Sequence, residues 1–144
     1  MKKGIYCIIL GLAFLGYSFS QTDNNVNIRV EITNVVVNGG RVYLVFFSTA
    51  ENFRNETPDY AFILEAQSTT LSQELSFPAG EYVISAFQDA NNNQRLDSNF
   101  LGVPRELVGI SNYFGRGLPS RNFDRQKIPI NSSTGTVTIG LYRF

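Results

Sequence analysis

Hydrophobic and polar residues alternate along several short stretches of the chain, and this two-residue period predicts β-strands. In residues 26–32 (VNIRVEI), Val and Ile occupy every second position and Asn, Arg and Glu the positions between. Side chains of a strand point alternately to its two faces, so this spacing gives one apolar face and one polar face. A half-buried strand is therefore predicted over residues 26–33.

Five further strands are predicted. Residues 41–48 (RVYLVFFS) are apolar on both faces, which favours a central position in a sheet. Asn38-Gly39-Gly40 lies just before this strand and predicts a β-hairpin, because Asn and Gly tolerate positive φ. Pro78-Ala79-Gly80 predicts a tight turn. The remaining predicted strands are residues 61–66, 71–77, 81–88 and 135–144.

The segments between the strands lack an amphipathic helix of useful length. Residues 49–60 are rich in charged residues and are expected to form a surface loop, with Phe53 folded back onto the sheet. Residues 120–127 are expected to form at most one helical turn, capped by Ser120. Short strands separated by turns predict an all-β fold, an antiparallel β-sandwich with one long loop over about residues 89–127.

The first 20 residues have the pattern of a secretory signal peptide. Lys2 and Lys3 precede an apolar run over residues 5–19, and Ser18-Phe19-Ser20 supplies small residues for cleavage before Gln21. A membrane anchor is the alternative, but a spanning helix needs about 20 apolar residues. The single cysteine, Cys7, would be removed with the signal, so a lipoprotein is not expected. The prediction is one domain over residues 21–144, secreted, periplasmic or at the cell surface, with no membrane span after cleavage.

Composition excludes several classes of function. The chain has no histidine, which excludes a Ser-His-Asp triad and imidazole metal sites. One cysteine cannot form an intramolecular disulfide or a thiolate zinc cluster. A formal net charge of zero argues against a protein that depends on electrostatic attraction to nucleic acid or anionic lipid.

Residues 89–97 (DANNNQRLD) carry the most specific chemical pattern. Oxygen-bearing side chains at alternating positions of a curved loop are what Ca²⁺ requires. Gln94 stands where calcium loops usually have Gly, and Phe100 stands where a closing Glu is usual. The alternative is a set of Asx turns that need no metal. The predicted metal ligands are Asp89, Asn91, Asn93, the Arg95 carbonyl, Asp97 and Glu106, with Asn99 as a substitute for Glu106.

A second candidate surface lies later in the long loop. Tyr113, Phe114 and Phe123 could present aromatic faces to a sugar, or they could simply pin the loop to the sandwich. The predicted ligand surface consists of Tyr113, Phe114 and Arg116. The several Arg residues of this loop could hold an anion, although a solvated charged face is the more ordinary outcome.

A series of four motifs carries a resemblance to a known family. Phe77-Pro78-Ala79-Gly80-Glu81-Tyr82 runs into the Asp89–Asn99 segment, followed by Gly102-Val103-Pro104-Arg105-Glu106 and Gly109-Ile110-Ser111-Asn112. This series resembles the secreted bacterial domain of unknown function number 2141. The resemblance implies a prealbumin-like or immunoglobulin-like sandwich and no established activity. The family's usual His and Gly are Gln88 and Gln94 here.

Together these features predict an exported, non-enzymatic β-sandwich with a calcium-stabilised loop. It would serve as a binding or structural module for a protein or glycan partner. A carbohydrate-binding or adhesion module is the alternative, with the aromatic loop as its site. A metal-assisted hydrolase that uses Asp89, Asp97 or Glu106 as base is the third hypothesis, weakened by the lack of any catalytic motif.

Overall fold

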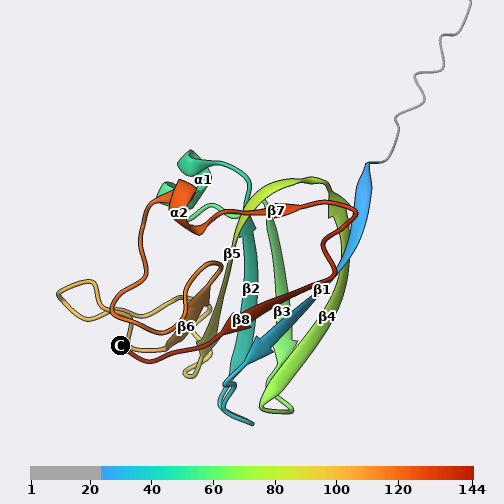
Figure 1. The fold of residues 1–144 in the computed structure, drawn as a ribbon. Coiled ribbons are helices and arrows are strands. Elements are labelled where there is room, and N and C mark those ends of the chain that lie inside the picture. Colours follow the sequence, from blue (N-terminus) through green and yellow to red (C-terminus); the bar gives the residue numbers. More distant parts are fainter. Residues whose placement is uncertain (1–23) are drawn as a thin grey trace, which may run out of the picture.

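The computed structural model describes residues 24–144, so the predicted signal peptide and the cleavage before Gln21 lie outside the described residues. Two β-sheets pack face to face (Figure 1). One sheet has the order β4 (Thr70–Pro78), β1 (Asn25–Thr33), β8 (Thr136–Gly140). The other has the order β3 (Tyr60–Glu65), β2 (Arg41–Phe47), β5 (Gly80–Asp89), β6 (Leu107–Ile110), and β7 (Ile128–Ile130) pairs with the start of β5.

The core between the sheets comes from the alternating apolar positions. Ile28, Val30 and Ile32 of β1 are at most 1% exposed and pack with Val42, Leu44 and Phe46 of β2. The polar positions between them face outward, as the period of a strand requires. The all-β sandwich is thus confirmed, and so is the central position of β2, which lies between β3 and β5.

One strand pair departs from the predicted antiparallel arrangement. β8 runs parallel to β1, with Val30 opposite Val137 and Ile32 opposite Ile139. The predicted last strand, residues 135–144, is also shorter than expected, because β8 ends at Gly140. After it, Tyr142 forms an isolated bridge with Val108, so the chain end leaves the first sheet and reaches β6 of the second.

The predicted hairpin at Asn38-Gly39-Gly40 is wrong. Asn38 and Gly40 do adopt positive φ, at 58° and 94°. However, β1 pairs with β4 and β8 whereas β2 pairs with β3 and β5, so the turn connects two different sheets. Backbone bonds from Val35 to Thr69 and from Asn38 to Ala66 tie this connection to the one between β3 and β4. Turn residues set local curvature, but they do not determine which strands pair.

The predicted turn at Pro78-Ala79-Gly80 is confirmed, and it also connects the two sheets. β4 ends at Pro78 in one sheet and β5 begins at Gly80 in the other. The Tyr82 hydroxyl donates a hydrogen bond to the Pro78 carbonyl at 2.9 Å and closes the turn. The aromatic residue of the Pro-x-Gly-x-Tyr motif therefore has a structural role.

The expected loop over residues 49–60 contains a short helix, α1 (Ala50–Asn55). Thr49 caps it, because its Oγ1 accepts a hydrogen bond from the Asn52 N–H at 3.1 Å. The charged composition hid this helix, since its polar residues face solvent and none of its residues is buried. The predicted position of Phe53 is confirmed: its ring packs against Phe47, with centroids 5.4 Å apart.

The long segment 89–127 was expected to be a loop with at most one helical turn, but it contains more regular structure than that. It contains β6, which pairs with β5, and the helical turn α2 (Phe123–Gln126). The turn lies within the predicted range, but Asn122 is its cap and Ser120 is not. β7 follows directly and was also missed. Four-residue and three-residue strands are too short for a periodic pattern to be read from sequence.

Gly109 lies within β6, although glycine has a low propensity for β-strands, and its position explains why glycine is needed there. A Cβ atom at this position would lie 2.2 Å from the Gly140 carbonyl oxygen. Only glycine permits this close approach between β6 and the end of β8. Among residues 24–144, no helix has the length and apolar character needed to cross a membrane.

Candidate functional site

The loop that carries the predicted metal ligands connects β5 to β6 and extends away from the sheets beside β6 (Figure 1). It begins at Asp89, the last residue of β5, whose side chain is fully buried. The Asp89 carboxylate accepts hydrogen bonds from the backbone N–H groups of Asn93 (3.1 Å) and Gln94 (2.7 Å). The loop therefore curls around this carboxylate.

The curl requires unusual backbone angles at two positions. Asn92 and Gln94 have φ values of 57° and 65°, in the left-handed region. Asn enters this region readily, whereas Gln does so at a cost in strain. The bond from the Gln94 N–H to Asp89 offsets that strain. This explains how the loop keeps its shape although Gln replaces the usual glycine.

Three more of the predicted ligands converge inside the curl. The side-chain amide of Asn91 donates to Asp97 Oδ2 at 2.7 Å, and that of Asn93 donates to both Asp97 oxygens at 3.1 Å. The amide oxygens also form Asx turns: Asn91 Oδ1 accepts from the Asn93 N–H, and Asn93 Oδ1 accepts from the Arg95 N–H. Asp89, Asn91, Asn93 and Asp97 thus form one connected polar cluster, which we call the Asx cluster.

Glu106 closes the loop at its base. Its Oε1 accepts from the Ala90 N–H at 2.9 Å and its Oε2 accepts from the Asp97 N–H at 3.2 Å. The residue is 6% exposed. One carboxylate therefore bridges the beginning of the loop to its ninth residue, and Glu106 acts as a clamp on the backbone.

The donor chemistry of the Asx cluster fits a hard divalent cation. All of its side-chain acceptors are oxygens, which Ca²⁺ prefers. A carboxylate has about four acceptor positions and an amide oxygen has two, so the hydrogen bonds described leave capacity for an ion. Among residues 24–144, no three acidic side chains gather as a metal-binding group, so an ion here would also need the Asn amide oxygens.

The Asn91 and Asn93 amides present NH₂ groups to Asp97, and these are positive ends of dipoles. An ion at Asp97 would have to displace them, and the amides would then turn their oxygens inward. Asn99 lies outside the cluster: its Oδ1 accepts from the N–H groups of Leu101 and Val103. The Asn99 side chain therefore stabilises the next turn by bonding to nearby backbone N–H groups.

That next turn forms a small hairpin at the outer end of the loop, over residues 97–105. Ser98 and Pro104 form a bridge, and the Arg105 N–H donates to the Asp97 carbonyl at 2.8 Å. The tip exposes two large apolar side chains, Phe100 at 94% and Leu101 at 72%. In the sequence, Phe100 was noted only because it replaces the Glu that usually closes a calcium loop, and the exposed tip was not predicted.

The residues of the second predicted surface have divided roles. Tyr113 packs on Tyr142 and Phe144, with centroids 5.5 and 5.7 Å apart, and its hydroxyl donates to the Gly117 carbonyl. Burial raises the pKa of the Tyr113 hydroxyl, and Tyr142 raises it further. Tyr113 thus pins the loop, whereas Phe114 is 83% exposed and Arg116 is exposed.

The Gly-x-Ser-Asn motif has a structural role. The Ser111 hydroxyl donates to the Gln126 carbonyl and accepts from the Ile84 N–H at 3.1 Å. The Asn112 amide donates to the Lys127 carbonyl at 2.9 Å. These two neighbours therefore fasten α2 and the segment after it to the edge of β5. The Gln126 side-chain oxygen is buried without a hydrogen-bond partner among the described residues.

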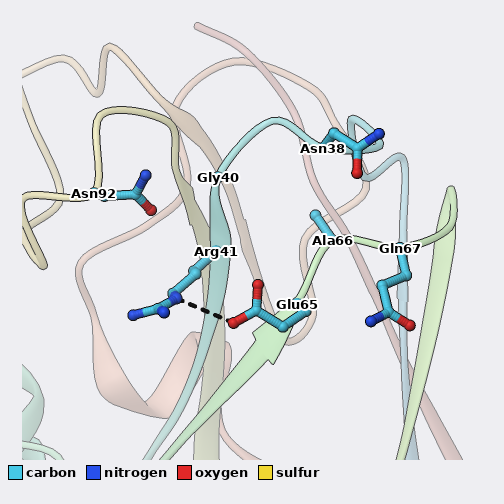
Figure 2. A pocket seen from close by; sticks show the side chains of 7 residues that line it. All are labelled: Asn38, Gly40, Arg41, Glu65, Ala66, Gln67 and Asn92. Atoms are coloured by element: carbon cyan, nitrogen blue, oxygen red, sulfur yellow. Dashed lines mark hydrogen bonds and ion pairs between the residues drawn. The ribbon is translucent and has the colours of Figure 1, made fainter.

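A polar pocket of about 630 Å³ lies beside the Asx cluster and was missed from sequence (Figure 2). The Arg41–Glu65 ion pair, with N and O atoms 3.1 Å apart, lies along it, and Asn92 approaches from the loop. The signal in the sequence that could have indicated this pocket was the pair of opposite charges, Arg41 and Glu65, on two neighbouring predicted strands. The lining residues are Asn38, Gly40, Arg41, Glu65, Ala66, Gln67 and Asn92.

Comparison with known proteins assigns the chain to a family but to no characterised protein. The search of curated proteins finds no match. The family model described as "Uncharacterized protein conserved in bacteria (DUF2141)" matches residues 30–142, which include both sheets, the Asx cluster and the Glu106 clamp. The chain therefore belongs to this uncharacterised bacterial family, as its motifs predicted.

Proposed function

We propose that the protein is an exported, non-enzymatic β-sandwich whose β5–β6 loop is stabilised by Ca²⁺. The ordered loop would serve as a binding or structural element in the periplasm or at the cell surface. The observation that carries this proposal is the convergence of Asn91 and Asn93 on the Asp97 carboxylate, together with the bond from the Asn93 N–H to the buried carboxylate of Asp89. Four oxygen-bearing residues at calcium-loop spacing are thus held by one curled backbone.

The ion would have a structural effect in this proposal. The amide groups of Asn91 and Asn93 now partly neutralise Asp97. A divalent cation carries far more charge than two amide dipoles, so it would hold the loop more firmly. With two carboxylates in the cluster, we expect a dissociation constant of roughly 10⁻⁴–10⁻³ M, in the range of extracellular calcium modules. An exported protein meets calcium at such concentrations.

The positions of the buried carboxylates support a non-enzymatic role. Glu106 directs both oxygens at backbone N–H groups, and so does Asp89. A general base must instead reach a proton of the substrate. The bonds that these two carboxylates form with backbone N–H groups hold the loop in shape.

Limited proteolysis tests the calcium proposal on the full chain. We expect cleavage within residues 90–105 to slow when Ca²⁺ is added and to accelerate when it is chelated, while the sheets resist cleavage in both conditions. Asp97→Asn keeps the shape of the side chain but removes its charge, so it should abolish the difference made by calcium. Asp124→Asn is the matched control, because Asp124 is an exposed carboxylate on α2 that pairs with Lys127, the residue after this helix. Equal cleavage with calcium and with chelator in the wild-type chain would refute the proposal.

A further inference from the structure

Charge is distributed unevenly between the two halves of the chain. Residues 24–88 contain three Arg and seven acidic residues, whereas residues 89–144 contain seven Lys or Arg and four acidic residues. Two of those four, Asp89 and Glu106, are buried and bonded to backbone N–H groups. The second half therefore has a clear positive surplus at its surface, which a net charge of zero for the whole chain conceals.

Three arginines of this half lie at the base of the 97–105 hairpin or next to it in the chain. Arg105 belongs to the hairpin itself, and Arg143 donates from its guanidinium to the Arg105 carbonyl at 3.2 Å. Arg95 lies in the Asx cluster turn, two residues before the hairpin. All three are exposed, and none forms an ion pair within residues 24–144.

The tip of the same hairpin is apolar and held in shape. The Asn99 side chain accepts the N–H groups of Leu101 and Val103, and the Asn99 N–H donates to the Val103 carbonyl at 2.8 Å. Phe100 and Leu101 therefore project from a preorganised turn, which lowers the entropy lost on binding. Phe114, from the neighbouring segment pinned to Tyr142 by Tyr113, adds a second exposed aromatic side chain on this half.

We infer that this hairpin docks on the surface of an anionic phospholipid bilayer, with Phe100 and Leu101 inserted among the lipids and the arginines at the headgroups. This inference deepens the proposed function, because it rests on the same ordered loop and names what the loop binds. Amphipathic insertion combines buried apolar area with attraction to anionic lipid.

A bilayer fits the hairpin better than an acidic protein partner does. Protein interfaces bury apolar residues at the centre of a packed patch. Phe100 and Leu101 are 94% and 72% exposed, so neither is packed against other residues of the chain that could form the centre of such a patch. A fluid lipid surface needs no such complementary wall. The long side chains of Arg105 and Arg143, which lie at the base of the hairpin, can reach headgroups while the apolar residues enter the acyl region.

The test uses the full chain carrying Phe100→Trp. The wild-type chain contains no Trp, so this residue becomes the only indole. We expect its emission to shift to shorter wavelength with phosphatidylglycerol vesicles, and brominated acyl chains to quench it. Phosphatidylcholine vesicles should have little effect. Ile63→Trp is the matched control: Ile63 is 58% exposed on β3, in the half with the negative surplus, and should not respond. The control also separates loop insertion from any binding through the apolar N-terminal residues.

Two further variants set the size of the effect. Arg105→Gln with Arg143→Gln, in the Phe100→Trp chain, should weaken partition into these vesicles by about thirtyfold. Leu101→Ser in the same chain should weaken it by about tenfold. Partition that is unchanged by these substitutions, equal quenching of Trp at positions 63 and 100, or no quenching of either would overturn the inference. Binding to soluble polyglutamate without quenching by brominated lipid would favour an acidic protein partner and would also overturn it.

The same assay separates this inference from the calcium proposal. Quenching at position 100 that persists in chelator, together with proteolysis that does not depend on calcium, would remove the ion and keep the membrane surface. Calcium-dependent proteolysis without quenching at position 100 would keep the calcium proposal and remove the membrane surface.

Discussion

Glu106 provides the most direct test of how the β5–β6 loop is held. Glu106→Gln preserves the size of the side chain, but its amide has only one acceptor oxygen. One of the N–H groups of Ala90 and Asp97 then faces an NH₂ group, which cannot accept a hydrogen bond. A hydrogen bond to a charged group contributes about 1.5–3 kcal/mol, and a buried donor without a partner costs about 1–3 kcal/mol.

These contributions are partly offset, because the variant no longer buries a charge. We therefore expect a loss of about 2–3 kcal/mol in the free energy that opposes local opening of the loop. The loop can open without the sheets, so the free energy of global unfolding should fall by less. Hydrogen exchange of the Ala90 and Asp97 amides should accelerate by about 30- to 150-fold.

Glu74→Gln is the control, because Glu74 forms an exposed ion pair with Arg29, and its loss should change stability by no more than about 1 kcal/mol. Hydrogen exchange resolved by residue and urea denaturation give the two measurements. If both amides exchange in Glu106→Gln as slowly as in the wild-type chain, Glu106 is not the clamp described here.

Two other perturbations have clear expected outcomes. Gly109→Ala places a Cβ atom against the Gly140 carbonyl, so thermal or urea unfolding should show a loss of about 1–3 kcal/mol; wild-type stability would refute the close approach. At Asp59, burial acts to raise the pKa, but hydrogen bonds from the Ser48 N–H and the Asn52 amide outweigh it and leave the pKa lowered. The stabilisation is therefore present above the unfolded-state value of about 3.9 and is lost as pH falls through the lower folded value. Asp59→Asn should then cost less than about 1 kcal/mol near neutral pH and progressively less in acid, and an urea-unfolding difference that grows with acidity would contradict this.

The sequence predicted the elements with a strong two-residue period and failed for those without one. β1, β2, β4 and β5 lie close to their predicted bounds. The short strands β6 and β7 were missed because a few residues cannot display a two-residue period. Both strands are stabilised by pairing with β5, which the local sequence does not reveal. Their existence depends on tertiary contacts, which local patterns do not report.

Strand pairing was predicted less well than strand position. Asn38 and Gly40 adopt the positive φ that their residue types suggest, yet the turn connects two sheets. The two-residue hairpin signal assumes that neighbouring strands pair, and here β4 and β8 lie beside β1. The parallel partner β8 is more than a hundred residues away along the chain, beyond the range of any local signal.

The candidate site was predicted in part. The spacing of Asp89, Asn91, Asn93 and Asp97 suggested a shared centre, and the structure brings these four residues together by hydrogen bonds, whereas their role as metal ligands stays a prediction. The clamp by Glu106 on two backbone N–H groups depends on the return of the chain to β6 and was not foreseen. The exposed tip was missed since its residues were judged only as possible ligands.

The decisive measurement for calcium binding is isothermal titration of the purified protein with calcium, at low salt and after treatment with chelator. We expect one binding event with a dissociation constant of roughly 10⁻⁴–10⁻³ M and a rise in melting temperature, both lost in Asp97→Asn. No heat and no melting shift at several millimolar calcium would contradict this expectation, and the Asx cluster would then be a self-sufficient network of hydrogen bonds.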